Sequence, residues 1–256
     1  MNKELQDVQL RYKENPKSNR FSALIFGALG CGKTKLAETC PKPVLIHSFD
    51  PDGTNSIDPA LIASGEVIVD NRWEASGPFY QTAFNDWEQE MRNLLNKGVF
   101  EEVGTFMVDT LTTWAFSART LIQHATKDLE VNKKITAIEK LAKAPDRWDY
   151  SLEHNTVLNC IRLILAVPCN VIVTAHDQIK VNEDEGILER TILATGKLTG
   201  LIPPLFSEFY GMEREGDKRY LITQKQGKWP ARTRYEGKLS PQEEPDISNI
   251  LHKIGG

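Results

Sequence analysis

The stretch FSALIFGALGCGKT, residues 21–34, joins a short apolar run to a glycine-rich turn and a Lys-Thr pair. It matches the pattern G-x-x-x-x-G-K-[ST], which binds a triphosphate when it links a strand to a helix. The glycines let backbone N–H groups surround phosphate oxygens, the lysine reaches the β- and γ-phosphates, and the hydroxyl binds Mg²⁺. A glycine turn that binds nothing is the alternative, and the flanking strand and helix patterns disfavour it. The predicted phosphate loop consists of Gly27, Ala28, Leu29, Gly30, Cys31, Gly32, Lys33 and Thr34.

The composition is that of an ordinary globular chain. Of its 256 residues, 40% are hydrophobic and 26% are charged, and this length suits one large α/β domain or a domain with an insertion. The net charge of −4 excludes a uniformly basic nucleic-acid coat, so any contact with nucleic acid must come from a local patch. No apolar stretch reaches about 18 residues, the length that crosses a bilayer, and the charged residues 1–20 do not resemble a signal peptide.

The four cysteines indicate a reducing compartment. They contain no C-x-x-C pair, so we expect reduced thiols rather than zinc ligands or disulfides. The sequence therefore predicts a cytoplasmic protein with no membrane partner. The cysteines are Cys31, Cys40, Cys160 and Cys169.

Apolar runs alternate with helical patterns along the chain. The strand-like runs are continuous, which indicates strands covered on both faces. Strands that alternate with helices predict a three-layer α/β fold with a mainly parallel sheet. Such a sheet binds ligands at the carboxyl ends of its strands, where the phosphate loop begins. The predicted strands span 23–26, 43–48, 67–69, 105–108, 170–174 and 219–223, and the predicted helices span 34–40, 83–97, 111–125 and 152–166.

The predicted domain organisation has one large unit. Residues 1–20 form an N-terminal extension, residues 21–238 form the nucleotide-binding domain, and residues 239–256 form a C-terminal tail. Within the domain, 127–147 is a charged helical excursion that is either solvated or in contact with a partner or DNA. Residues 177–192 carry acidic and polar residues around a glycine and are expected to form a mobile loop.

Two acidic residues follow apolar runs and are candidates for the chemistry at the phosphate loop. Asp109 ends one run, and an aspartate in this place holds Mg²⁺ together with the loop hydroxyl of Thr34. Asp50 ends another run and is predicted to polarise the attacking water. The alternative for Asp50 is a turn-forming role, with Asp52 as a second candidate for the water-activating residue.

A histidine follows the apolar run at 170–174. His176 at this strand end can sense the γ-phosphate through a hydrogen bond, whereas Asp177 beside it would add negative charge near phosphate. The alternative for His176 is a structural role in capping a loop. His47 lies inside a predicted strand, and we expect a buried residue with a hydrogen-bond partner rather than a catalyst.

One segment of the chain is strongly basic. Residues 214–238 hold eight basic and three acidic residues, a net charge of +5 in a chain whose net charge is −4. Within it, Arg232 and Arg234 are two residues apart, which places both on one side of an extended strand, where their guanidinium groups suit phosphate oxygens. The alternative is a solvated sheet edge that its charge protects.

The order of these motifs resembles that of the RecA-type core ATPases, in particular the small phage-encoded RecA-like proteins of single-strand annealing and recombination. The resemblance covers residues 20–236. The phosphate loop is specific for nucleotide binding but not for this family, and the other motifs add to it through their order. The motifs are GALGCGKT at 27–34, LIHSFD at 45–50, FMVDT at 106–110, VIVTAH at 171–176, GKLTGLIPP at 196–204 and R-x-R at 232–234.

The resemblance implies a RecA-like P-loop core and a role for each matching residue. Asp50 takes the place of the water-activating acid, Asp109 that of the metal-site acid, and His176 that of a polar sensor that links the γ-phosphate to a DNA-binding loop. Arg232 and Arg234 fall where related ring ATPases carry a basic pair that acts on a neighbour's nucleotide. The chain departs from RecA in having Asp at 50 and His at 176, and it shows no N-terminal polymerisation domain.

The resemblance also implies the function. We expect ATP and Mg²⁺ to bind between adjacent subunits of a ring or filament, with Lys33 and the neighbour's arginines stabilising charge on the transferred phosphoryl group. Hydrolysis would be stimulated by DNA and serve recombination or single-strand annealing. The expected partners are single-stranded DNA at 177–192, further copies of the chain and a single-strand DNA-binding protein, in the cytoplasm of a bacterial host.

Two other functions fit the phosphate loop. One is a kinase that acts on small molecules or nucleosides. Such enzymes usually have an arginine-rich lid, whereas the charged segment 127–147 contains a single arginine, Arg147. The other is a nucleotide-dependent assembly switch with little turnover, which tight ATP binding without hydrolysis would identify.

Overall fold

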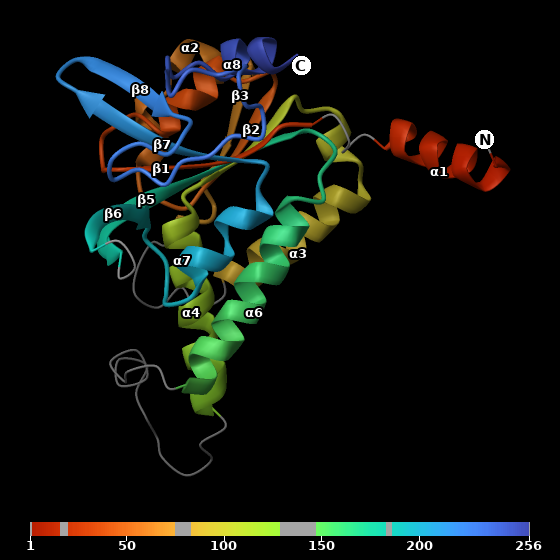
Figure 1. The fold of residues 1–256 in the computed structure, drawn as a ribbon. Helices are drawn as coiled ribbons and strands as arrows, with labels where there is room; N and C mark the ends of the chain where they lie inside the picture. Colours follow the sequence, from red (N-terminus) through yellow and green to blue (C-terminus); the bar gives the residue numbers. More distant parts are fainter. Residues whose placement is uncertain (1, 16–19, 75–82, 129–146, 183–185, 256) are drawn as a thin grey trace.

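The computed structural model describes residues 2–15, 20–74, 83–128, 147–182 and 186–255. In these parts of the chain, one sheet lies between two layers of helices (Figure 1). The sheet is mainly parallel and ends in an antiparallel C-terminal extension. The α/β fold class predicted from the sequence is therefore confirmed.

The sheet has the strand order β3-β2-β4-β5-β1-β7-β8-β9, and β6 pairs with β5 outside this row. Strands β3, β2, β4, β5, β1 and β7 run parallel to one another, whereas β8 is added antiparallel to β7, and β9 antiparallel to β8. Strand β5 thus lies between β1, which leads into the phosphate loop, and β4, which ends in Asp109. The bounds are β1 Ser22–Gly27, β2 Val44–Ser48, β3 Val67–Asp70, β4 Thr105–Asp109, β5 Asn170–Asn182, β6 Ile187–Ile192, β7 Glu208–Glu215, β8 Lys218–Ile222 and β9 Gln242–Glu243.

Two apolar cores flank the sheet. Leu24 and Phe26 of β1 belong to the core shared with α3, α4 and α6, whereas Ala23 and Ile25 belong to the core shared with the 3₁₀ helix η2 and with α8. Because both faces are covered, every residue of β1 is buried and its sequence is a continuous apolar run. The helices are α2 Pro59–Ala63, α3 Ala83–Asn96, α4 Leu111–Asp128, α6 Arg147–Ile164, α7 Leu198–Leu201 and α8 Ile247–Ile254, with 3₁₀ helices η2 Thr34–Thr39, η3 Gly53–Ser56, η4 Val99–Glu101 and η5 Pro203–Leu205.

An aromatic cluster joins β2 to the helical layer. Trp87 of α3 is fully buried against Trp114 of α4, with the ring centroids 5.2 Å apart. The Trp87 indole N–H donates to Nδ1 of His47 at 3.0 Å, and His47 is itself fully buried. Burial lowers the pKa of His47 to about 4, so the ring is neutral near pH 7 and accepts this bond. The prediction of a buried, hydrogen-bonded His47 is confirmed.

Segments 177–192, 208–215 and 239–256 differ from what the sequence predicts. Residues 177–182 and 187–192, which lie in the predicted loop 177–192, are the paired parts of β5 and β6, and Asp177 pairs with Ile192. The sequence pattern does not predict β7, because charged residues at both of its ends interrupt the apolar run. The segment 239–256 is not only a tail, because it contributes β9 and α8, whose Ile250 is fully buried.

The charged excursion predicted at 127–147 lies mostly outside the described residues. Helix α4 ends at Asp128 and α6 begins at Arg147, and the two helices lie side by side (Figure 1). In the N-terminal extension, helix α1, Lys3–Glu14, has no buried residue. Among the helices of the described residues, none has the length and apolar character that a bilayer span requires.

Gly211→Ala is expected to destabilise the fold. Gly211 lies in β7, and a Cβ atom there would stand 2.3 Å from Cε3 of the buried Trp229 ring. Moving this ring from the core should lower the free energy of unfolding by about 1–3 kcal/mol in urea titrations. Gly200→Ala is the control, because a Cβ atom at Gly200 in α7 has no neighbour within 4 Å. Equal stability of the two variants would contradict this account of the Trp229 contact.

Candidate nucleotide-binding site

The phosphate loop follows β1 and is held against the neighbouring strand β7. Gly27, the last residue of β1, pairs with Met212, and a Cβ atom at position 27 would lie 2.3 Å from the Met212 carbonyl oxygen. Gly32 has a φ of 102°, a backbone conformation that favours glycine. Backbone geometry therefore requires both glycines of the motif, as expected of a loop whose N–H groups turn inward around an anion.

The helix after the loop agrees with the predicted one to within one residue. The sequence predicts a helix over 34–40, and the structure has the six-residue 3₁₀ helix η2 over Thr34–Thr39. Pro41 lies two residues beyond the end of this helix and disfavours its continuation. A short 3₁₀ helix aligns few peptide dipoles, so anion binding here depends mainly on the N–H groups of the loop and on Lys33.

Lys33 is folded back over the loop. The residue is 6% exposed, and Nζ donates to the carbonyl oxygens of Gly27 and Ala28, each at 2.9 Å. Cys31 lies beside it, with Sγ 3.8 Å from Nζ. Burial raises the pKa of the Cys31 thiol, so this neutral sulfur is not a counter-charge for the ammonium group. The ammonium group therefore lies at the centre of the loop, where a bound phosphate would meet it.

A hydroxyl and a carboxylate meet at the start of η2. Oγ1 of Thr34 donates to Oδ2 of Asp109 at 2.6 Å, and the Thr174 hydroxyl donates to Oδ1 of the same carboxylate. Asp109 is 1% exposed, and burial raises the pKa of its carboxyl, while the two hydroxyl bonds oppose this shift. The described residues contain no group of three or more His, Cys, Asp or Glu side chains placed to hold a metal. An ion at this pair would therefore need oxygen ligands from water and from a bound phosphate, as is usual for Mg²⁺.

Asp50 lies at the centre of a hydrogen-bond network. Its Oδ1 accepts from Thr110 at 3.1 Å and from Thr113, and its Oδ2 is 2.8 Å from Nε2 of His176. Burial alone would raise the pKa of Asp50, but the bonds from His176, Thr113 and Thr110 outweigh it and lower the pKa below its usual range. Asp50 is therefore an ionised carboxylate held in one orientation.

Parallel strand pairing explains why these side chains meet. Strands β2 and β4 are neighbours, with Ser48 beside Asp109, and β1 and β5 are neighbours, with Gly27 beside His176. The carboxyl ends of β1, β2 and β4 lie at one edge of the sheet, and β5 crosses this edge at His176 before it continues to Asn182. Residues far apart in the sequence therefore come together around the phosphate loop, as the sequence analysis expects.

A cavity of about 320 Å³ opens at this edge of the sheet. Its lining includes the phosphate loop together with Asp50, Asp109 and His176. Asp52, the second candidate for the water-activating residue, is not part of the lining. It adopts a left-handed φ of 58° at the start of η3, and its backbone N–H donates to Glu74. This geometry is that of a turn residue, which leaves Asp50 as the candidate base.

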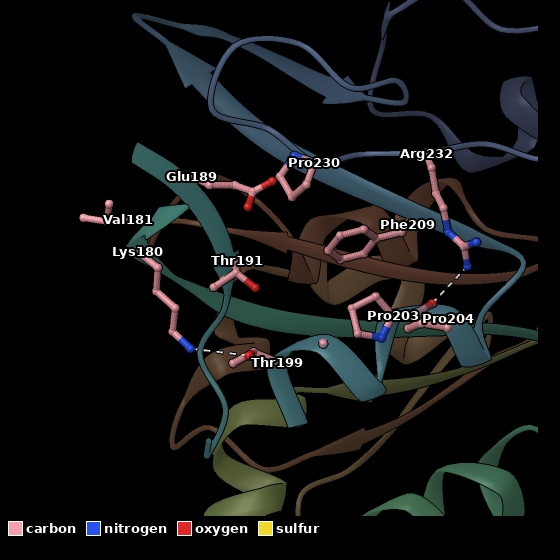
Figure 2. Close-up of a pocket in the computed structure, with 11 residues that line it drawn as sticks. Lys180, Val181, Glu189, Thr191, Thr199, Pro203, Pro204, Phe209, Pro230 and Arg232 are labelled. Atoms are coloured by element: carbon pink, nitrogen blue, oxygen red, sulfur yellow. Dashed lines mark hydrogen bonds between the residues drawn. The ribbon is translucent and has the colours of Figure 1, made fainter. Parts of the chain in front are cut away.

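The arginine pair of the basic segment lies outside this cavity. Arg232 bridges to Phe209, which pairs with the middle of β1 rather than with its carboxyl end. Figure 2 shows the Arg232 side chain at a second cavity, of about 520 Å³, where its guanidinium donates to the carbonyl oxygen of Pro203 at 3.2 Å. Arg234 is exposed to solvent. Neither side chain lines the phosphate cavity of its own chain, and their action on a neighbour's nucleotide stays a prediction.

Arg219 of β8 lines the phosphate cavity, although its sequence pattern indicates no site role. It is one of eight basic residues within 214–238, and nothing in the local pattern separates it from the other seven. Its place depends on the register between β7 and β8, which the sequence does not reveal because β7 itself is not predicted. The sequence also does not distinguish Thr113, which bonds to Asp50, because a threonine on a helix is a common residue.

The sequence matches a family model described as an AAA domain over residues 19–235. Among solved structures, the chain is similar to a KaiC-like protein from Pyrococcus horikoshii, with 12% identity, a TM-score of 0.44, and 86% of this chain and 83% of that chain covered. It is also similar to an ATPase from the type III secretion system of pathogenic bacteria, with 11% identity, a TM-score of 0.42, and 76% of this chain and 52% of that chain covered. No curated protein matches the sequence. Because the family match spans most of the chain, including the phosphate loop and both acidic strand ends, the chain belongs to the AAA domain family of P-loop ATPases.

Proposed function

We propose that this chain binds ATP with Mg²⁺ and hydrolyses ATP. The observation that carries the proposal is the 2.6 Å contact between Thr34 Oγ1 and Asp109 Oδ2 at the end of a loop that contains Lys33. A hydroxyl, a carboxylate and an ammonium group in this arrangement are the protein groups that P-loop ATPases use around a magnesium-bound triphosphate. Membership of the AAA domain family supports the same conclusion.

Thr34 and Asp109 are the residues that would hold the Mg²⁺ ion. Hydroxyl and carboxylate oxygens are ligands that Mg²⁺ prefers. Bound there, the ion would neutralise charge on the β- and γ-phosphate oxygens. Asp109 must be ionised for this role. Its burial favours the neutral form, and the hydroxyls of Thr174 and Thr34 favour the ionised form.

Asp50 is the proposed water-activating residue. A carboxylate offers about four lone-pair positions, and Thr110, Thr113 and His176 occupy three of them. One lone-pair position remains for a water molecule. This water would donate a hydrogen bond and then a proton to Asp50, with the water oxygen directed at the γ-phosphate. Lys33 would stabilise the negative charge that develops on the transferred phosphoryl group.

We propose that the hairpin beyond His176 couples the nucleotide site to bound DNA. Strand β5 continues without a break past His176 into the hairpin with β6, so a shift of this histidine moves the hairpin base. The hairpin exposes Ile179, Val181 and Leu188, each more than half accessible, and the basic Lys180. We propose that these side chains contact single-stranded DNA in recombination or annealing. The resemblance to phage RecA-like proteins supports this partner.

Nucleotide binding between subunits is a further part of the proposal. Arg234 is the better placed of the two arginines for a neighbour's nucleotide, because Arg232 already donates to the carbonyl oxygens of Pro203 and Phe206 in its own chain. An arginine that reaches a transferring phosphoryl group is worth roughly 10³–10⁵ in rate in other P-loop enzymes. A ring or filament of this chain would bring Arg234 of one copy to the phosphate loop of the next.

The purified protein is expected to release phosphate from ATP when Mg²⁺ is present. Lys33→Ala should lower kcat by roughly 100-fold or more, because the ammonium group at the loop centre is lost. Lys218→Ala is the matched control, since Lys218 is exposed on β8, and its turnover should equal that of the wild type. Tight ATP binding without phosphate release would favour the assembly switch. Transfer of phosphate to a nucleoside would favour the kinase.

The same assay with single-stranded DNA, and with the oligomer mass measured on the same sample, tests the DNA partner. Turnover is expected to rise when DNA is added. DNA-independent turnover by a monomer would remove the recombination role and leave the phosphate site intact.

Mixing Arg234→Ala with Lys33→Ala tests for a shared site. Each variant alone should have little turnover, because one lacks the arginine and the other lacks the loop lysine. A mixed assembly contains some interfaces that join an intact Lys33 to an intact Arg234, and these should recover part of the activity. Phosphate release that stays at the level of the separate variants would argue against nucleotide binding between subunits.

Asp109→Asn and Asp50→Asn are expected to shift stability in opposite directions. Folding raises the pKa of Asp109, so its ionised form costs stability at neutral pH, and the cost disappears as pH falls through the raised pKa. Asp109→Asn should therefore stabilise the metal-free protein at pH 7. Folding lowers the pKa of Asp50, so Asp50→Asn should destabilise it at pH 7 by about 1 kcal/mol or more. Urea unfolding at several pH values measures both. Shifts of the same sign at pH 7 would contradict this assignment of charges.

A further inference from the structure

Four basic side chains line the phosphate cavity, and three of them are engaged within the chain. Lys33 donates to loop carbonyls, Lys35 pairs with Glu38 at 2.8 Å, and His176 bonds to a carboxylate. Arg219 differs, because among the described residues its Nε is buried and has no hydrogen-bond partner. A buried N–H without an acceptor costs free energy, so its presence at a cavity points to a ligand that accepts hydrogen bonds.

Strand register explains why Arg219 reaches this cavity. Met212 of β7 pairs with Gly27 at the end of β1 and with Leu221 of β8. Leu221 is buried in the core on the η2 side of the sheet, whereas Tyr220 packs against the opposite core. Side chains two apart on a strand share a face. Arg219 therefore continues the Leu221 row past the carboxyl end of β1, on the side where the phosphate loop lies.

The aliphatic part of Arg219 lies directly against the loop. A Cβ atom at Gly32 would stand 2.9 Å from both Cδ and Nε of Arg219. The side chain thus crosses the backbone just before Lys33, whose neighbouring N–H groups are those that a P-loop turns toward phosphate. A guanidinium group in this place presents planar donors suited to two phosphate oxygens at once.

We infer that Arg219 binds the polyphosphate of the nucleotide held by its own chain, from the flank of the loop opposite Asp109. The inference rests on the proposed function, because it requires a nucleotide in the phosphate loop. Strand β1 lies between β5 and β7, so Asp50, Asp109 and His176 stand on one flank and Arg219 stands on the other. Water attack is assigned to the Asp50 flank. Arg219 accordingly contacts phosphates that remain in ADP rather than the γ-phosphate alone.

Nucleotide affinity of Arg219→Ala tests this inference. Titration of the full chain with Mg·ADP and with a non-hydrolysable Mg·ATP analogue should show Kd raised about 10- to 100-fold for both nucleotides, by similar factors. Arg219→Lys keeps the charge without the planar fork and should give an intermediate Kd. Lys218→Ala removes one positive charge from the adjacent exposed position and should bind like the wild type. Thermal unfolding of each variant shows that the fold is retained.

The outcomes separate this inference from the proposed function. If Arg219→Ala binds both nucleotides as tightly as the wild type while Lys33→Ala does not, Arg219 is not a phosphate ligand and the ATP site stands. If Arg219→Ala weakens binding of the ATP analogue alone, the inferred contact with phosphates that remain in ADP is wrong. If the wild type binds neither nucleotide, the proposed function fails, and the inference fails with it.

Discussion

The meeting of Asp50, Asp109 and His176 at the phosphate loop depends on one constraint, that adjacent parallel strands run through the same edge of a sheet in the same direction. Strands β2, β4, β5 and β1 are successive parallel neighbours, so the last residues of β2, β4 and β1 and the part of β5 around His176 face the same region. Asp50 follows β2, Asp109 ends β4, His176 lies within β5 beside Gly27, and the loop follows β1. The helices that pack on both faces of the sheet set the order of the strands. This order brings the residues of the site together.

The two aspartates of the site stand in different environments and suit different tasks. Asp109 is almost fully buried with two hydroxyl donors, so its carboxylate gains most from a nearby cation. Asp50 has three donors, including His176, and stays ionised without a metal. Burying a carboxylate such as Asp109 costs stability, a cost typical of residues that serve binding rather than folding.

Local patterns are sufficient for the central strands and the loop, and they fail where pairing is not local. The run at 23–26 predicts β1 to within one residue at each end. The hairpin at 177–192 is missed because its exposed apolar residues, such as Ile179 and Val181, do not form a buried run. The pattern at 34–40 predicts η2 to within one residue, but it does not show that the helix is of the 3₁₀ type. Arg219 is missed because its neighbours depend on the register between β7 and β8, which no local pattern reveals.

The sequence by itself determined the phosphate loop, the buried strands and the polar residues at the strand ends. These follow from local chemistry, because glycine permits the loop backbone and continuous apolar runs require burial on both faces. The tertiary structure alone decided which polar groups meet: Asp50 rather than Asp52 lines the cavity, and Arg219 rather than Arg232 reaches the loop. Strand order and register bring together segments far apart in the chain, and packing among those segments, not the pattern within any one of them, selects that order.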